Sequence, residues 1–545
     1  MPELVEYPCS FVGCTSTVLG WEVKCQFCNV VLCGLHDNDN NYECCRLAKL
    51  EHDERNEALY KVRQATREKN LNHILEQIKT HQATLDKEVS TIRPGHTFSL
   101  IIPKLEDLVK SKWYADFNVH FLINFEDDVN WLLRVRQPYG PSPPQEISDI
   151  VMTSEVTTLN FLKANGIPVP GAWLPKHLRD GNSNAVARLP FDYFIYEFVE
   201  SKPLKINKDP YKPIGLPPNE LRKFVEGYAK IQIQLSNIPL EHTEIGSLFT
   251  SPNDESSAKD VRVGPIIGTL TFMQPSPPYF FGPFRSNKER YLAHIDATLG
   301  YISKGALYKD NLIDDYLWHL ELRELVNGCQ ELDRQTDKVY VKHADERGDH
   351  LMVNEEGKII SFLDWEWAYV TTKEEAFSTP KLFHQDYEWM RLGDNSLREA
   401  ERILIECYEL HGRSDLADCV RRGKLYTRLE GIGNYDPLCI KKGFREVFGD
   451  DIPEDFHPPE NDVDWRIYMM KRYENLEGLK TVMEDYGWSI ERAENKKEKW
   501  RIRQVEIETE RKKWMAEEEE NMKKRFEEMK KAYYQEKARN AELGA

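Results

Sequence analysis

The stretch from Val341 to Val370, VKHADERGDHLMVNEEGKIISFLDWEWAYV, constrains the fold more than any other part of this 545-residue chain. Two short apolar runs, LMV and IISFL, flank a polar EEGK turn, a pattern that predicts a β-hairpin. Asp345 precedes the first run and Asp364 follows the second. Phosphoryl transfer needs one carboxylate to orient and deprotonate the attacking hydroxyl, and another to hold magnesium beside the nucleotide phosphates. One hairpin can supply both.

Length and composition narrow the class of protein. A chain of 545 residues is too long to fold around a single hydrophobic core. Its 40% hydrophobic and 30% charged residues are typical of folded domains. The net charge of −18 argues against a nucleic-acid partner. No apolar run is long enough to cross a bilayer, and the start, MPELVEYPCS, lacks the features of a secretory signal. We therefore expect an intracellular, cytoplasmic protein with no membrane partner.

Apolar patterning predicts the main helices and strands. The segments FNVHFLINF and WLLRVR, separated by the turn residues EDD, predict a β-hairpin, and FDYFIYEFV predicts another strand. A helix is expected over 148–164, and mainly helices beyond residue 200. The stretch 50–92 predicts an amphipathic helix, which we expect to pack on the next domain because its stripe is too irregular for a free coiled coil. The stripe consists of Leu71, Ile74, Leu75, Ile78, Leu85, Val89 and Ile92.

The resulting domain hypothesis has five parts. They are a zinc-binding module over 1–46, a helical linker over 47–93, a β-rich lobe over 94–200, a mainly helical lobe over 201–488 and a charged helical tail over 489–545. The tail is dense in Lys, Arg and Glu, which predicts a long solvated helix that can pair with a protein partner. The fold class expected is α+β.

Cysteines cluster at the start of the chain, where seven of the eleven lie within the first 45 residues. In a reducing compartment such clustering indicates metal rather than disulfides. Eight candidate ligands, the number that two tetrahedral zinc sites require, are Cys9, Cys14, Cys25, Cys28, Cys33, His36, Cys44 and Cys45. Two alternatives stay open, namely that one site is filled or that some of these cysteines are simply buried.

The same series resembles the AN-one-type zinc finger, in which two residues separate the fifth ligand from a histidine and five more separate that histidine from a second one. Tyr42 stands at the second histidine position here, so we expect Cys45 beside Cys44 to complete that site. The cross-braced pattern implies one structural zinc held by Cys9, Cys14, Cys33 and His36, and another held by Cys25, Cys28, Cys44 and Cys45. Such fingers commonly bind proteins, so a protein partner is implied.

The 341–370 stretch resembles the catalytic segment of aminoglycoside phosphotransferases and related small-molecule kinases. In that family H-x-D, and an Asn five residues after the Asp, precede an I-D-W-E-like segment. The resemblance implies a bilobal protein-kinase-like fold, with Asp345 as catalytic base, His343 as a structural member of the loop and Asp364 as a magnesium ligand. His350 stands at the Asn position and is the candidate second magnesium ligand, a substitution similar to a GDH phrase in fungal members.

Other segments follow the order that this family requires, over about residues 98 to 440. Arg134 occupies the place of the phosphate-contacting basic residue, and Glu155 resembles its ion-pair partner on the following helix. Backbone groups from Glu197 to Val199 would meet the adenine ring. The sequence departs from the family by having Arg for Lys, and KWYADFNVHF where a glycine-rich loop is expected.

Two functions from different classes are compatible with these residues. The first is an ATP- and magnesium-dependent phosphotransferase acting on a hydroxyl of a small molecule, as the resemblance implies. The alternative is a catalytically weak or inactive kinase-like scaffold that binds protein partners through its zinc finger and charged tail. The sequence names neither the phosphate acceptor nor the oligomeric state.

Overall fold

The computed structural model describes residues 5–8, 17–20, 61, 64–111, 113, 117–137, 145–179, 188–204, 214–250, 258–268, 277–307, 312–384, 389, 392–430 and 441–542. These residues belong to two compact units. The larger comprises Arg63–Leu307 and Asp315–Glu460, and the smaller comprises Met1–Val62, Tyr308–Asp314 and Asn461–Ala545. The domain limits expected at residues 46, 93, 200 and 488 stay predictions.

The larger unit contains a five-stranded antiparallel sheet with the strand order β3-β4-β5-β7-β6. Its strands are β3 (Phe98–Leu100), β4 (Asn118–Phe125), β5 (Asn130–Arg136), β6 (Ala172–Trp173) and β7 (Tyr193–Glu197). The pairing of β4 with β5 places His120 opposite Arg134, and Arg134 in turn lies opposite Phe194. The hairpin predicted from FNVHFLINF and WLLRVR is confirmed.

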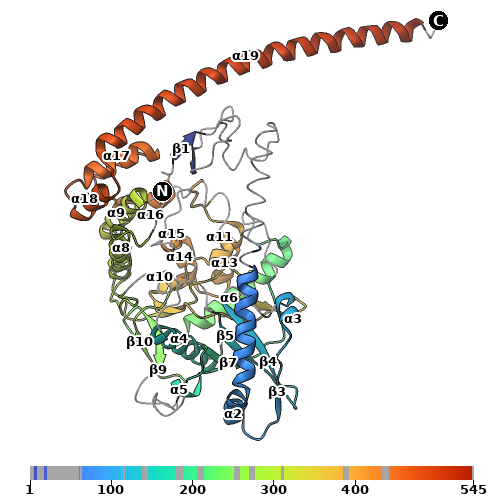
Figure 1. Ribbon diagram of the computed structural model, residues 1–545, viewed down its shortest axis with the longest axis vertical. Coiled ribbons are helices and arrows are strands. Elements are labelled where there is room, and N and C mark those ends of the chain that lie inside the picture. The colour runs from blue at the N-terminus through green and yellow to red at the C-terminus, as the bar shows by residue number, and fades with distance from the viewer. Residues whose placement is uncertain are drawn as a thin grey trace. The chain divides into compact units, whose positions relative to one another are not determined.

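Alternating apolar residues along β4 bury one face of this sheet, with Val119, Phe121, Ile123 and Phe125 at or below 5% exposure. That face packs on α2 (Gln82–Ile92) and on helical residues 64–80, whose ribbon runs beside the strands in Figure 1. The predicted stripe residues Leu71, Ile74, Leu75, Ile78, Leu85 and Val89 all lie in this core. Burying each such side chain stabilises the fold by roughly 1.5–3 kcal/mol. The described part of the predicted segment, residues 64–92, therefore packs on the sheet as expected.

The hairpin predicted at residues 351–363 is formed by β12 (Leu351–Val353) and β13 (Ile359–Phe362), which pair antiparallel. A third strand, β8 (Lys202–Pro203), pairs with β12. Asn354 closes the turn, because its N–H donates to the carbonyl of Lys358 across 3.0 Å and its own carbonyl accepts from Gly357. Gly357 has φ +77°, a conformation that glycine adopts without steric cost.

The larger unit also contains two-stranded sheets and helices. The sheets are β9 (Ser247–Thr250) with β10 (Val261–Gly264), and β11 (Tyr340–Lys342) with β14 (Tyr369–Thr371). The longer helices are α4 (Gln145–Ala164), α6 (Pro218–Ser236), α8 (Asn287–Ser303), α9 (Leu312–Gly328), α13 (Glu399–Leu410), α14 (Ser414–Arg422) and α16 (Lys441–Phe448). The short elements are α3 (Leu105–Lys110), α5 (Lys176–Arg179), α10 (Lys373–Ala376), α11 (Lys381–His384), α15 (Lys424–Leu429), η1 (Glu331–Asp333) and η2 (Gly449–Asp451).

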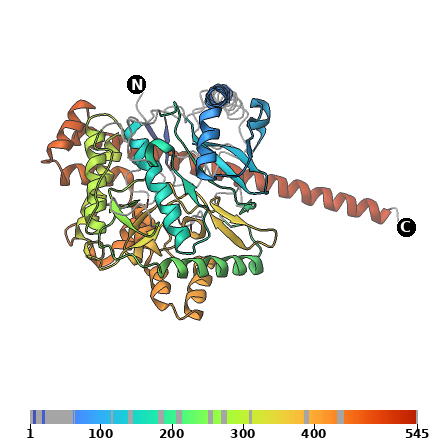
Figure 2. The same cartoon turned by 90° about the horizontal axis from the view of Figure 1, so that it is seen from below.

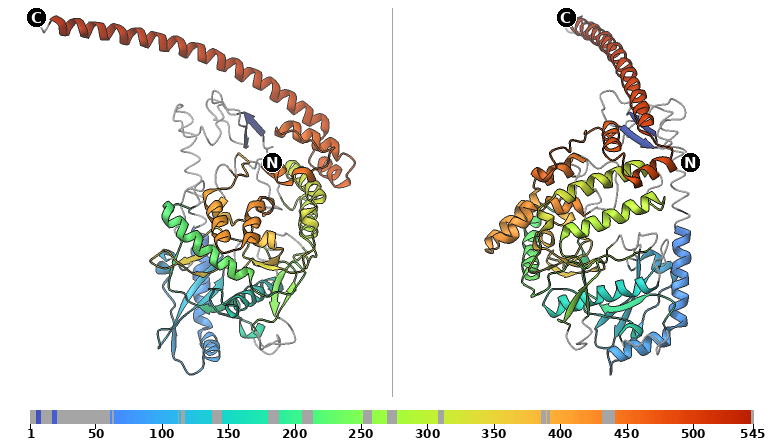
Figure 3. Two further views of the ribbon diagram at one scale, coloured as in Figure 1. Left: turned by 180° about the vertical axis from the view of Figure 1, so that it is seen from behind. Right: turned by 90° about the vertical axis from the view of Figure 1, so that its left-hand side faces the viewer.

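Pairs of these helices lie side by side. Helix α6 packs along α13, as Figure 2 shows in green and orange. Helices α8 and α9 run beside each other in Figure 3, and an ion pair of 3.1 Å joins Asp296 of α8 to Arg323 of α9. With its small sheets and many helices, the larger unit is a mixed α and β structure, in agreement with the α+β class expected.

The smaller unit contains the strand pair β1 (Val5–Pro8) and β2 (Thr17–Gly20), and the helices α17 (Asp462–Arg472), α18 (Glu477–Asp485) and α19 (Ile490–Glu542). The long charged helix predicted for the tail is confirmed by α19, which spans 53 residues (Figure 1). All eight predicted zinc ligands lie outside the described residues. Within the described residues, no helix combines the length and the apolar character needed to span a membrane.

Candidate active site

The two loops that carry Asp345 and Asp364 are joined by His343. The backbone N–H of Asp345 donates to Nδ1 of His343 across 3.3 Å. Because Nδ1 accepts, the ring proton lies on Nε2, which is 2.8 Å from the carbonyl oxygen of Leu363. Leu363 directly precedes Asp364, so a single imidazole connects both loops. These contacts support the structural role expected of His343.

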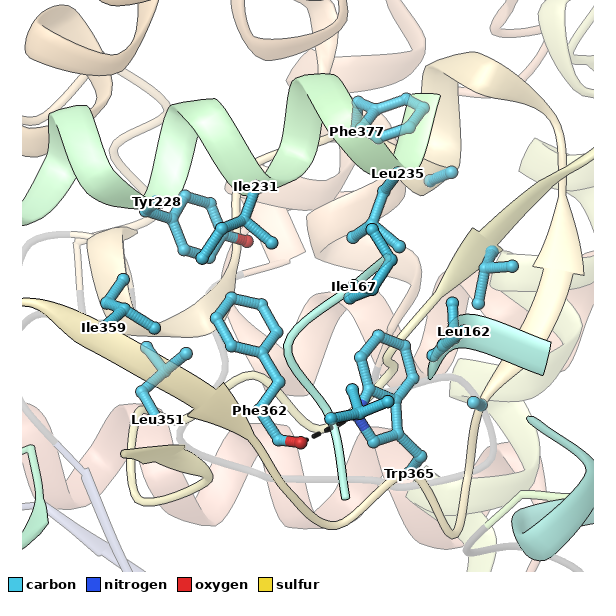
Figure 4. Close-up of a cluster of buried hydrophobic side chains, with 14 of the residues drawn as sticks. Leu162, Ile167, Tyr228, Ile231, Leu235, Leu351, Ile359, Phe362, Trp365 and Phe377 are labelled. Atoms are coloured by element: carbon cyan, nitrogen blue, oxygen red, sulfur yellow. Dashed lines mark hydrogen bonds between the residues drawn. The ribbon is translucent and has the colours of Figure 1, made fainter. Parts of the chain in front are cut away.

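Asp364 lies two residues after the end of β13 and is followed by the buried Trp365. The Asp364 backbone has φ +62°, a conformation that Asp tolerates better than most residues, and its side chain is 51% exposed. Trp365 is 1% exposed and stacks on Phe362, whose carbonyl accepts from the indole N–H across 3.2 Å (Figure 4). The buried indole therefore fixes the turn while the Asp364 carboxylate faces solvent, as a metal ligand must.

Arg134 of β5 contacts Asp364. Its guanidinium forms ion pairs with Glu155 of α4, with Glu366 at 3.0 Å and with Asp364 at 3.5 Å. Arg134 and Asp364 are 230 positions apart in the sequence, and the guanidinium side chain is only 8% exposed. The structure thus brings together three of the residues predicted for the site, namely Arg134, Glu155 and Asp364.

Burial lowers the pKa of Arg134, but the carboxylates of Glu155, Glu366 and Asp364 outweigh burial and raise that pKa above its usual value. Burial also raises the pKa of Glu155. The negative charges of Glu366 and Asp364 raise this pKa further, and the positive charge of Arg134 opposes the rise. A cavity of about 40 Å³ adjoins these ion pairs, lined among others by Arg134, Arg136 and Glu155.

His350 does not suit the magnesium role expected for it. Its ring is 4% exposed and lies 4.3 Å from the ring of His343. Burial, with a smaller contribution from the positive charge of Arg347, lowers the pKa of His350 well below 6.5, so the ring is neutral. Nδ1 accepts the N–H of Gly348 across 3.3 Å, which leaves the proton on Nε2. A protonated ring nitrogen cannot bind a cation, and magnesium prefers oxygen. The contacts of His350 are those of a packing residue.

Arg347 is a site residue that the sequence interpretation missed. Its Nη2 lies 2.9 Å from Oδ2 of Asp345, and its side chain is 60% exposed. Burial lowers the pKa of Arg347, but the negative charges of Asp345, Asp349 and Asp364 raise it overall. The Arg347 guanidinium therefore interacts electrostatically with both predicted carboxylates, those of Asp345 and Asp364. An arginine two positions after the candidate base was the available signal.

Glu366 was missed as well, although it is the last acidic residue of the D-W-E segment. It is 4% exposed and accepts from both Arg134 and Arg136. An unpaired carboxylate at this depth would be strongly disfavoured, so two arginines on one strand were the signal that a buried acid must face them.

The predicted adenine contact is only partly available. The backbone N–H of Glu197 donates to the carbonyl of Gly171 across 2.9 Å, and the Glu197 carboxylate pairs with Lys163 and accepts from the Gly171 N–H. The carbonyl of Val199 accepts from the hydroxyl of Ser201 across 2.8 Å. The N–H of Glu197 is therefore committed to protein, and the backbone at Val199 is the remaining candidate of the two.

No group of three or more His, Cys, Asp or Glu side chains is arranged to hold a metal within the described part of the chain. Magnesium in nucleotide sites is bound by one or two carboxylates together with substrate phosphates and water, so a full protein cage is not required. The exposed carboxylate of Asp364 fits that chemistry.

Comparison with known proteins gives no match to a family model and no match among curated proteins. The solved structures similar to this chain include an ethanolamine kinase of Plasmodium vivax, which is 14% identical over 71% of this chain and 84% of that chain with a TM-score of 0.35. They also include a thermostable mutant of an aminoglycoside phosphotransferase in complex with ADP and hygromycin B (12% identity, 73% of this chain, 98% of that chain, TM-score 0.36). A third is the macrolide 2'-phosphotransferase MphH from Brachybacterium faecium (12% identity, 68% of this chain, 98% of that chain, TM-score 0.28).

Proposed function

We propose that this chain is an ATP- and magnesium-dependent phosphotransferase that acts on a hydroxyl of a small molecule. One observation carries the proposal: Arg134 contacts both Glu155 and Asp364 although they lie on separate elements. The residues nominated for phosphate binding, for the supporting ion pair and for metal binding therefore meet at one point. An ordinary surface ion pair would not require all three.

Each side chain has a defined task in this proposal. Asp345 accepts the proton of the attacking hydroxyl, and Arg347 holds its carboxylate in place. Asp364 provides an exposed oxygen for magnesium, and Arg134 provides positive charge for the phosphates. When bound, magnesium and ATP supply the phosphoryl group and neutralise the charge that develops on it. The zinc sites proposed for the first 46 residues rest on ligand spacing alone.

The test is turnover of ATP by the full chain with magnesium, comparing Asp345→Asn with Asp349→Asn. Both residues lie in the same loop, but Asp349 has an exposed side chain and no role in the proposal. Loss of a general base lowers turnover by about a hundredfold or more. Asp345→Asn should show this loss without a lower melting temperature, and Asp349→Asn should retain turnover. Equal turnover in both variants would exclude Asp345 as the base.

The scaffold remains a second candidate because α19 exposes apolar side chains. Met522, Phe526 and Met529 follow one another at steps of four and three residues and are 59%, 66% and 71% exposed. This spacing places them on one helix face, where a protein partner can cover them. A thermal-shift titration separates the candidates, since a ligand that binds only the folded state raises the melting temperature. No shift at millimolar ATP and magnesium would favour the scaffold.

A further inference from the structure

Glu366 bridges two arginines of the same strand. Arg134 and Arg136 alternate along β5, so their side chains emerge on one face of the sheet. Both donate to the Glu366 carboxylate, one to each of its oxygens. Glu366 is 4% exposed, and Arg136 also lies over the ring of Phe117 at 5.0 Å. The two guanidinium groups thus form a fork that shares the buried Glu366, and Arg134 also pairs with Glu155 and Asp364.

This fork lies beside the proposed metal ligand. Asp364 is two residues before Glu366 and contacts the same Arg134 guanidinium at 3.5 Å. Two arginines at this spacing suit a polyanion better than one carboxylate, because phosphate oxygens accept paired hydrogen bonds from guanidinium groups. As described, the fork is occupied by an acid that belongs to the protein itself. Phosphates arriving at Asp364 must therefore compete with Glu366 for the arginines.

We propose that Arg134 and Arg136 together bind the phosphates of a nucleotide, and that Glu366 is the internal competitor that holds both arginines until the nucleotide replaces it. The inference rests on the proposed function and adds two residues that the sequence interpretation did not assign. In this proposal the ion pairs of Glu366 with the two arginines lower the affinity for nucleotide. Neutralising Glu366 should therefore strengthen binding, the reverse of what loss of a supporting residue does.

Calorimetric titration of the full chain with ATP and magnesium tests this inference through affinity and needs no turnover. Glu366→Gln keeps the shape of the side chain and removes its charge, so Kd should fall at least about threefold relative to the unmodified protein. Arg136→Gln removes one arm of the fork, so Kd should rise at least about threefold. Glu401→Gln is the matched control, because Glu401 is a fully buried acid paired with Lys424 on other helices. Its Kd should not change.

The outcomes separate this inference from the proposed function. If the unmodified chain binds ATP but Glu366→Gln binds it equally or more weakly, the competitor role is overturned and the proposed function stands. If neither protein binds, both are overturned. Should Glu366→Gln fail to fold, Arg136→Gln decides alone, since an unchanged Kd in that variant would remove the fork from the phosphate site.

Discussion

Replacing His350 by asparagine tests whether this position packs the loop or binds metal. The imidazole lies 4.3 Å from His343 and meets the edge of Phe362 at 5.9 Å. Aromatic pairs of this kind contribute about 0.5–1.5 kcal/mol each beyond the area they bury. Asparagine can still accept the Gly348 N–H but loses both ring contacts, so we expect the free energy of unfolding to fall by about 1–3 kcal/mol. Urea unfolding followed by tryptophan fluorescence measures this loss.

The same variant should leave magnesium affinity unchanged when ATP is titrated at several magnesium concentrations. His384→Asn is the matched control, because His384 is also buried and, at the end of α11, lies 3.0 Å from the carbonyl oxygen of Pro380. It should lose comparable stability. The packing role of His350 would be refuted if His350→Asn had the same urea midpoint as the unmodified protein and bound magnesium more tightly.

Three further predictions follow from the contacts. Arg347→Met should lower turnover at least about tenfold, because the Asp345 carboxylate loses the guanidinium that holds it. Arg347→Lys should recover part of this loss. Equal turnover in the unmodified protein and both variants would exclude this role of Arg347. Burial lowers the pKa of His120, His294 and His319 to about 4, below the 6.5 of an unfolded histidine. The folded state therefore prefers the neutral rings. The stability that these rings contribute is complete above pH 6.5 and is lost as pH falls toward 4. An unchanged urea midpoint between pH 7 and pH 4.5 would contradict this prediction. Trp365→Ala removes a side chain that is 1% exposed and should cost about 3–5 kcal/mol in urea unfolding, with weaker nucleotide binding because the Asp364 turn loses its support.

Local pattern was sufficient to predict the hairpins and several helices. Period-two alternation in FNVHFLINF identifies β4 because one face of that strand is buried, and the EEGK turn identifies the β12–β13 hairpin because Gly357 has positive φ. The helix expected over 148–164 is three residues longer at its start, as α4 begins at Gln145. Element ends are the least determined by local pattern, because capping and tertiary packing decide them.

The electrostatic arrangement of the site could not be read from the sequence. Arg134 and Glu366 are 232 positions apart, so the two arginines of β5 could indicate that an acid faces them but not which acid. The position of His350 suggested a metal ligand, but its tautomer depends on the Gly348 N–H and its burial depends on Phe362 and His343. Such roles follow from which atoms face each other after folding.

The central claim is that Asp345 and Asp364 act on one magnesium nucleotide. A crystal structure of the full chain with magnesium and a non-hydrolysable ATP analogue tests it most directly. We expect an Asp364 oxygen about 2.1 Å from magnesium, with the Asp345 carboxylate facing the terminal phosphate. A nucleotide bound elsewhere, or a magnesium ion held without Asp364, would contradict the account.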